Sequence, residues 1–465
     1  MEQGLHDGIA VVTEADLLNF VNELSDELYA LVKTDMAKIE ELQENLHAKL
    51  VNHYALVDKN DSLNRSKKLY IHSFIEMKFS EMIREFQERI QHRLTIQEKL
   101  TKLKTLKLPE QRSKEWYDIR EKILTASSLA DAIGEGHFST REELLIQKCG
   151  GPRPDVPFHI VEWGVMYEPV ATRFYELMNN LTVLEFGLVP HPEFKIFGAS
   201  PDGICDSDSP ADYVGRMLEI KCPWRRQFTK EVPKHYWMQM QGQLESCDLE
   251  ECDFLQVKLE EYTDTDSYKA DFIMEDELVE SEDEIVEPEA GIVKPEAGIV
   301  KHGYTSSGLP KGLLLAFITY STEGNPKISY EYGEFYQSFD ALEQWSAKVI
   351  AEYREKNIHY DECKKHWWKI ERYECTLVGR DREWWLSVQP KIIDFWEDVE
   401  HYRKEGVQVL LDKKEEKKLK KIKMREDKKK NPKKKNPKKK PTQNVFEIQK
   451  ATVEELQSNY FLNSD

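Results

Sequence analysis

Two carboxylates and a lysine lie on what reads as a β-hairpin. Asp202 stands in a turn, and Glu219-Ile220-Lys221 follows within an apolar run typical of a strand. Residues two apart in a strand point to one face, so Glu219 and Lys221 face the same side. With Asp202 beside them they suit a hard divalent cation, Mg²⁺ or Mn²⁺. The chemistry expected is phosphodiester hydrolysis, in which the cation activates a water that the lysine orients or deprotonates.

The Asp…Glu-x-Lys pattern alone is weakly specific, because an exposed hairpin that carries an ion pair has the same sequence. Its context adds specificity, since further motifs stand in order on either side of it. These motifs are Trp116-Tyr-Asp-Ile-Arg120, Leu124-Thr-Ala-Ser-Ser128, Trp163-Gly-Val-Met-Tyr-Glu168, Tyr236-Trp-Met-Gln-Met-Gln241 and Cys252-Asp-Phe254.

The ordered motifs resemble the YqaJ-like viral recombinase family, the phage lambda exonuclease-like branch of the PD-(D/E)xK nucleases. The resemblance covers residues 113–257. It implies an α/β (α+β) fold, a restriction-endonuclease-like core with a mixed central sheet flanked by helices. It also implies a Mg²⁺- or Mn²⁺-dependent exonuclease that degrades double-stranded DNA ends 5′→3′. Two alternatives stay open: an endonuclease of the same superfamily, and a DNA-binding scaffold without catalysis.

The resemblance assigns roles to the residues of the cluster. Asp202, Glu219, the backbone carbonyl of Ile220 and Glu168 are implied as metal ligands, and Lys221 acts on the attacking water. Glu168 instead becomes an ordinary surface residue if its helix turns the other way. The resemblance also implies a supporting glutamine on the helix that follows, which we assign to Gln241 in preference to Gln239.

Arg120, Ser127 and Ser200 match the family's groups for the terminal 5′-phosphate. A planar guanidinium beside hydroxyls recognises phosphate through charge-assisted hydrogen bonds, and anchoring a chain end places the scissile bond over the metal. Arg120 has the alternative of pairing with acidic neighbours on its helix. Ser127 has the alternative of capping a helix. Trp116 and Trp163 are expected in the core.

The chain is expected to divide into five regions. Residues 1–110 carry apolar residues at helical spacing, which predicts either a helical cap on the main domain or an oligomerisation module. Residues 111–338 form the nuclease core, with an acidic repeat-bearing insertion at about residues 262–309 between two strands. Residues 339–411 are predicted to be helical, with six tryptophans expected mostly in a core rather than stacked on bases.

The last two regions are a Lys-rich segment, residues 412–441, and a tail, residues 442–465. The Lys-rich segment has a net charge of +12 in a chain whose net charge is −19, and its prolines and like charges predict disorder. It is expected to serve as a nuclear-localisation signal, a sequence-independent DNA contact or a solubilising tail. The virus-like combination of insertion and basic tail favours a large DNA virus of eukaryotes as the source.

Composition excludes several other classes of protein. The sequence has no run of 18 apolar residues and no secretory signal, and its seven scattered cysteines favour a reducing compartment. We therefore expect an intracellular protein of the host nucleus or a cytoplasmic viral replication site, without a membrane partner. Its expected partners are double-stranded DNA ends, with a single-strand annealing protein and a second copy of the chain as open possibilities. Structural zinc and ATP-driven activity are not expected, for want of paired zinc ligands and a phosphate-binding lysine loop.

Overall fold

The computed structural model describes residues 64–152, 158–210, 212–229, 231–274 and 300–430. The chain divides into two compact units, residues 1–404 and 405–465. The helices of the described part are α3 (Arg65–Thr105), α4 (Lys114–Lys122), the 3₁₀ helix η2 (Ala126–Ser128), α5 (Leu129–Ala132), α6 (Arg141–Lys148), α7 (Phe158–Asn179), α8 (Lys234–Cys247), α9 (Thr265–Ala270), α10 (Phe339–Glu355), α11 (Arg382–Glu405) and α12 (Gln408–Lys430). None of these helices is long and apolar enough to cross a membrane.

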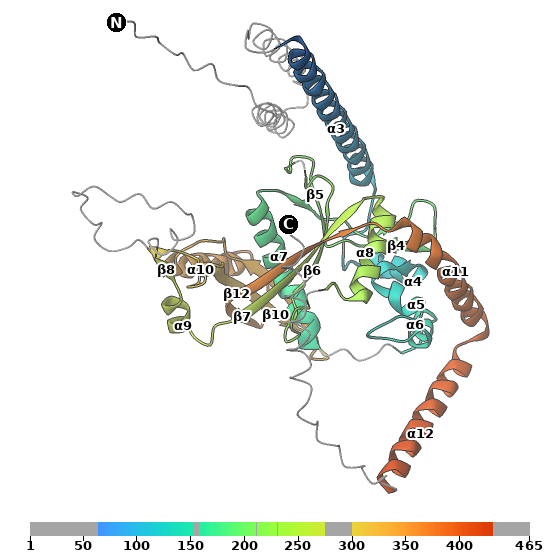
Figure 1. The fold of residues 1–465 in the computed structure, drawn as a ribbon. Helices are drawn as coiled ribbons and strands as arrows, with labels where there is room; N and C mark the ends of the chain where they lie inside the picture. Colours follow the sequence, from blue (N-terminus) through green and yellow to red (C-terminus); the bar gives the residue numbers. More distant parts are fainter. Residues whose placement is uncertain (1–63, 153–157, 211, 230, 275–299, 431–465) are drawn as a thin grey trace, which may run out of the picture. The chain divides into compact units, whose positions relative to one another are not determined.

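A seven-stranded mixed sheet with the order β11-β10-β12-β7-β6-β5-β2 forms the centre of the first unit (Figure 1). Its one parallel pair among the described strands is β6 with β7. Helix α8 forms the crossover connection that a parallel pair requires. The strands are β1 (Leu124–Thr125), β2 (Val183–Leu184), β3 (Val189–Pro190), β4 (Phe197–Ala199), β5 (Gly203–Cys205), β6 (Met217–Lys221), β7 (Glu251–Glu261), β8 (Ile273–Met274), β9 (Val300–Lys301), β10 (Lys311–Tyr320), β11 (Pro326–Tyr332) and β12 (Glu362–Gly379).

Helices cover both faces of this sheet, and the alternation of β6 decides which residue meets which helix. Leu218 and Ile220 join a core with the apolar face of α7. Met217 joins a second core with α8 and the last turns of α3. Because side chains alternate along a strand, Glu219 and Lys221 share the α8 face with Met217. The predicted α/β class with a mixed sheet flanked by helices is confirmed.

The expected helix of residues 1–110 lies partly outside the described residues, which begin at residue 64. The helical pattern that follows is α3, which starts at an N-cap where the Asn64 side chain accepts a hydrogen bond from the backbone of Lys67 at 2.9 Å. Its C-terminal turns bury Ile96, Leu100 and Leu103 against α8 and the sheet. This end of α3 is therefore a cap on the main domain.

One part of the region predicted to be helical is a strand instead. Residues 362–379 form β12, the long strand that pairs with β10 on one side and β7 on the other. A bulge between Ile370 and Arg372 interrupts its register with β7. The alternation of buried and charged residues, with Trp368 and Ile370 inside, was obscured by the adjacent tryptophans Trp367 and Trp368, which are both buried. Of the other tryptophans expected in a core, Trp367, Trp385 and Trp396 are buried, whereas Trp345 and Trp384 are half-buried.

The Lys-rich segment also differs from its prediction where the structure describes it. Residues 412–430 belong to α12 instead of being disordered, and Glu416 pairs with Lys420 one turn away at 2.6 Å. Acidic residues interspersed among the lysines support a helix through such pairs, and the first proline comes only at Pro432. The chain leaves and re-enters the domain through the β8–β9 pair, between β7 and β10, and residues 275–299 of the expected insertion lie outside the described residues.

Candidate nuclease active site

The two carboxylates and the lysine lie together at the start of β5 and on β6. Asp202 precedes β5, and its Oδ2 accepts a hydrogen bond from the backbone N–H of Ile220 at 2.7 Å. Lys221 forms an ion pair with Glu219 through Nζ and also donates to the carbonyl oxygen of Ile220 at 3.0 Å. The β5–β6 pairing therefore gathers the residues that the sequence pattern selected, with Glu219 fully buried.

Two glutamines of α8 hold the buried Glu219. Gln239 donates its side-chain amide to Oε1 of Glu219 and Gln243 donates to Oε2, each at 2.7 Å. They are four residues apart and lie on one face of the helix. Gln241 lies on another face, where it donates to the carbonyl of Gly379 at 2.8 Å and accepts from the backbone N–H of Asp381 at 2.6 Å. The assignment of Gln241 is therefore wrong: Gln239 and Gln243 support the site.

The charges of the cluster perturb one another. Burial raises the pKa of Asp202 well above its usual value, and the nearby Glu219 adds to the effect. Burial also raises the pKa of Glu168, against the attraction of Arg112 and Lys221. For Lys221, burial acts to lower the pKa, but the charges of Glu219 and Asp202 outweigh it and the pKa is raised. The lysine is thus held as a cation among carboxylates that would gain from a further positive charge.

A pocket of about 180 Å³ lies beside the cluster and joins the two sets of residues predicted to act on DNA. Asp202 and Glu168 line it, and so do Arg120, Ser127 and Ser200. Glu168 on α7 faces the pocket and pairs with Arg112 at 3.4 Å, so it is not an ordinary surface residue of its helix. Segments far apart in the chain thus meet in one cavity.

The residues assigned to the 5′-phosphate form a connected group. Arg120 donates from Nη2 to the hydroxyl of Ser127 at 3.2 Å, and its guanidinium lies 4.2 Å from the centre of the Trp116 ring. Trp116 in turn donates its indole N–H to the hydroxyl of Ser200 at 3.1 Å. Trp116 was expected in the core, but it lines the pocket, because α4 buries none of its residues. Trp163 does pack against the core of the α7 face.

Contacts from distant parts of the chain hold α4 and η2 beside the acidic cluster. Lys148 donates to the carbonyl oxygens of Arg120 and Ile123, at the C-terminal end of α4. Arg403 of α11 donates to the carbonyl of Glu121 at 2.6 Å. A Cβ at Gly242 of α8 would approach the Phe197 ring to 2.8 Å, so glycine permits the close packing of α8 on β4 and η2.

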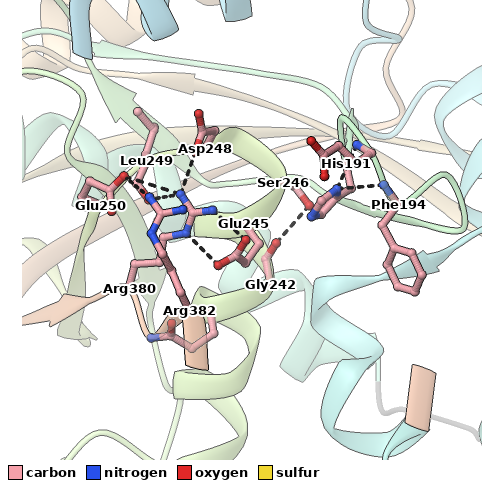
Figure 2. A network of polar contacts seen from close by, with 12 residues as sticks. His191, Phe194, Gly242, Glu245, Ser246, Asp248, Leu249, Glu250, Arg380 and Arg382 are labelled. Carbon is pink, nitrogen blue, oxygen red and sulfur yellow. Dashed lines mark hydrogen bonds and ion pairs between the residues drawn. The ribbon is translucent and has the colours of Figure 1, made fainter. Parts of the chain in front are cut away.

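The far end of α8 is fixed by a buried arginine network, shown in Figure 2. Arg380 follows β12 and forms two hydrogen bonds with the carboxylate of Glu245, at 2.7 and 2.6 Å, and one with Asp248 at 2.8 Å. Such paired guanidinium–carboxylate contacts fix orientation as well as distance. Together with the Gln241 contacts, they join α8 to the segment between β12 and α11. They thereby fix the position of α8, and with it the positions of Gln239 and Gln243.

The donor atoms fit a hard divalent cation. Within the described ranges no three His, Cys, Asp or Glu side chains are grouped to hold a metal ion by themselves. However, Mg²⁺ is commonly held by one or two carboxylates, with waters and substrate phosphates completing its shell. Asp202, Glu219 and the Ile220 carbonyl supply such a set of oxygens, and Glu168 lines the same pocket as Asp202.

Arg112, Gln239 and Gln243 are site residues that the sequence did not select. The spacing of the two glutamines could have indicated their shared role, because residues four apart in a helix lie on one face. No sequence pattern pointed to Arg112, because it lies in the loop between α3 and α4 and outside every motif.

The part of the chain that carries most of this site is similar to known proteins. Residues 115–250 match the family model described as the YqaJ-like viral recombinase domain. An uncharacterised protein of Acanthamoeba polyphaga mimivirus is 28% identical over 316 residues, which cover 63% of this chain and 53% of that protein. A protein of African swine fever virus is 24% identical over 160 residues, 29% of this chain and 46% of its own. The chain thus spans about half the length of these viral relatives, and the resemblance inferred from the motifs is confirmed.

Among solved structures, similar chains include an alkaline exonuclease from Laribacter hongkongensis. It is 18% identical, with a TM-score of 0.32, and the match covers 66% of this chain and 99% of that one. A phage-related exonuclease from Haemophilus somnus is 13% identical with a TM-score of 0.29, over 62% of this chain and 96% of that one.

Proposed function

Because residues 115–250 match a YqaJ-like viral recombinase domain, we propose that the protein is a metal-dependent exonuclease that degrades double-stranded DNA from 5′ ends. The observation that carries this proposal is the shared pocket, in which an acidic cluster for a cation adjoins an Arg–Ser group for a phosphate. An enzyme that cuts anywhere in a duplex has no need to bind a terminal phosphate beside its cleavage site.

Each residue has a distinct part in the proposed reaction. Asp202, Glu219 and the Ile220 carbonyl would hold Mg²⁺ or Mn²⁺, and Glu168, which lines the same pocket as Asp202, would be a further ligand. The cation supplies charge stabilisation at the scissile phosphate and acidifies a water. Lys221, kept protonated by its acidic neighbours, orients that water and the phosphate oxygen by donating hydrogen bonds.

The phosphate-binding group does the positioning. Arg120 and the hydroxyls of Ser127 and Ser200 receive the terminal 5′-phosphate, while Trp116 holds the arginine and Ser200 in place. Fixing the chain end beside the acidic cluster would convert cleavage into an effectively unimolecular step. The resulting 3′ overhang is a substrate for viral DNA recombination, repair or genome processing inside the infected cell, and a single-strand annealing protein is the partner that would use it.

The test uses linear and covalently closed duplex DNA with Mg²⁺, and compares the wild-type protein with Lys221→Ala. We expect digestion of linear DNA only, faster with a 5′-phosphate than with a 5′-hydroxyl. We expect the variant to lose at least about a thousandfold in rate while still binding DNA, because the removed group acts on the reacting atoms.

Two outcomes would contradict the proposal. Cleavage of the closed circle would indicate an endonuclease of the same superfamily. Binding of both DNAs without cleavage of either, under Mg²⁺ and Mn²⁺ alike, would indicate a DNA-binding scaffold.

A further inference from the structure

Arg112 places a second guanidinium in the pocket, apart from the group that contains Arg120. It belongs to the loop between α3 and α4 and lines the pocket together with Arg120 and Glu168. Its Nη2 lies 3.4 Å from Oε2 of Glu168, and its side chain is 47% exposed. That separation is long for a charge-assisted hydrogen bond, which ordinarily measures about 2.7–2.9 Å. The contact also uses only one of the five N–H groups of the guanidinium.

Contacts of Pro109 and Gln111 fix the loop that carries Arg112 beside the site. Gln111 donates its amide to the carbonyl oxygens of Phe186 at 2.9 Å and Pro201 at 3.2 Å, next to Asp202. A Cβ at Gly187 would collide with the carbonyl of Pro109, so the loop lies against the backbone of the 185–189 segment. The guanidinium therefore enters the pocket from a rigid support.

The backbone of Arg112 is strained in this position. Its φ is 66°, in the left-handed region that residues with a Cβ seldom adopt. A half-exposed ion pair contributes little to stability and does not compensate for such strain. Strained residues held by their surroundings concentrate at functional sites, which directs attention to a ligand rather than to Glu168 alone.

We propose that Arg112 is a second phosphate-binding arginine of the pocket, whose hold on Glu168 is exchanged for a DNA backbone phosphate. While no cation is bound, Arg112 neutralises Glu168; when that carboxylate turns to the cation, the guanidinium becomes available to the DNA. Arg120 then takes the terminal phosphate at the Ser127 end, and Arg112 takes an adjacent phosphate at the Glu168 end. This inference rests on the proposed function.

The test is a double-mutant cycle on DNA binding without divalent cations, so that cleavage plays no part. Fluorescence anisotropy measures the affinity for a 5′-phosphorylated duplex of the wild type, Glu168→Gln, Arg112→Gln and the double variant. Glu168→Gln releases Arg112 and is expected to tighten binding about tenfold, with the slope of log K against log salt steeper by about 1. The double variant is expected to lose both effects.

Arg173→Gln is the matched control, because Arg173 is 49% exposed and pairs with Glu176 on α7 at 3.3 Å, much as Arg112 pairs with Glu168. It is expected to leave DNA affinity within about twofold of the wild type. An equal gain from Glu168→Gln with and without Arg112 overturns the inference and leaves the proposed function standing. Wild-type protein that binds phosphorylated and unphosphorylated ends alike overturns the proposed function, and failure to bind DNA at all overturns both.

Discussion

The two halves of the site are built in different ways. The acidic half (Asp202, Glu219 and Lys221) lies within one hairpin, and neighbouring strands and two amides of α8 hold it. The phosphate half (Arg120, Ser127 and Ser200) comes from α4, η2 and the turn before β5, and its support comes from α6 and α11. The acidic half is local in sequence and buried, whereas the phosphate half is assembled from distant segments and more open.

This difference indicates a division of labour. Burial strengthens electrostatic interactions in the acidic half, where charge on the reacting phosphate must be stabilised. The phosphate half must admit and release a chain end, so its side chains are exposed enough to exchange water for DNA. Damage to the first half should therefore remove the chemistry, and damage to the second should remove the preference for a particular end.

The largest effect that separates the halves is expected for Arg120→Gln. The variant should lose about a hundredfold in kcat/KM on 5′-phosphorylated ends, the value of a charge-assisted contact, and almost nothing on 5′-hydroxyl ends. Steady-state rates on the two duplexes measure this.

Arg141→Gln is its matched control, since Arg141 also stacks on an aromatic ring, Phe395, and pairs with Asp398, but lies away from the pocket. Equal losses on both kinds of end would show that Arg120 contributes to chemistry and that the two halves are not separate.

A smaller and opposite pair of effects is expected along α8. Gln241→Leu leaves the Gly379 carbonyl and the Asp381 N–H without their partner, which should lower the free energy of unfolding by about 2–4 kcal/mol. Gln239→Leu removes the amide donor to Oε1 of Glu219, which keeps Lys221 as its partner, and should lower kcat about tenfold with little loss of stability. Urea unfolding and single-turnover cleavage, measured on both variants, distinguish the two positions. A reversal of this pattern would return the supporting role to Gln241.

The smallest effect concerns Asp131 of α5, which follows the phosphate half. Burial raises the pKa of Asp131 to about 6, against a hydrogen bond from the backbone of Ser139. Because the folded protein binds this proton more tightly than the unfolded chain, the stabilising contribution is present below about pH 3.8 and is lost as the pH rises toward 6.

Asp131→Asn should therefore unfold with a free energy about 1 kcal/mol higher than the wild type at pH 7, after allowance for solvent screening, and show no gain near pH 4. Urea titrations at the two pH values test this. A gain that is the same at both would show that the carboxyl titrates normally.

The sequence alone determined the acidic half and the central strands around it. Glu219 and Lys221 share a face because strand side chains alternate, and the apolar run that surrounds them predicts a buried strand, which is β6. Helices α6, α7 and α8 follow from apolar residues at helical spacing in the same way. Asp202 lies in a turn motif, and a single hairpin brings it next to Glu219 and Lys221.

Only the tertiary structure decided the rest of the pocket. Trp116 leaves the core because α4 buries none of its residues, and Gln241 leaves the site because Arg380 and the β12–α11 segment fix the rotation of α8. Residues 362–379 become a central strand because β7 and β10 each require a partner for their backbone groups. Arg112 enters through a loop held by carbonyls some 75 to 90 residues away, a separation that no local pattern encodes. Periodicity acts over a few residues, and the pocket depends on contacts between segments hundreds of residues apart.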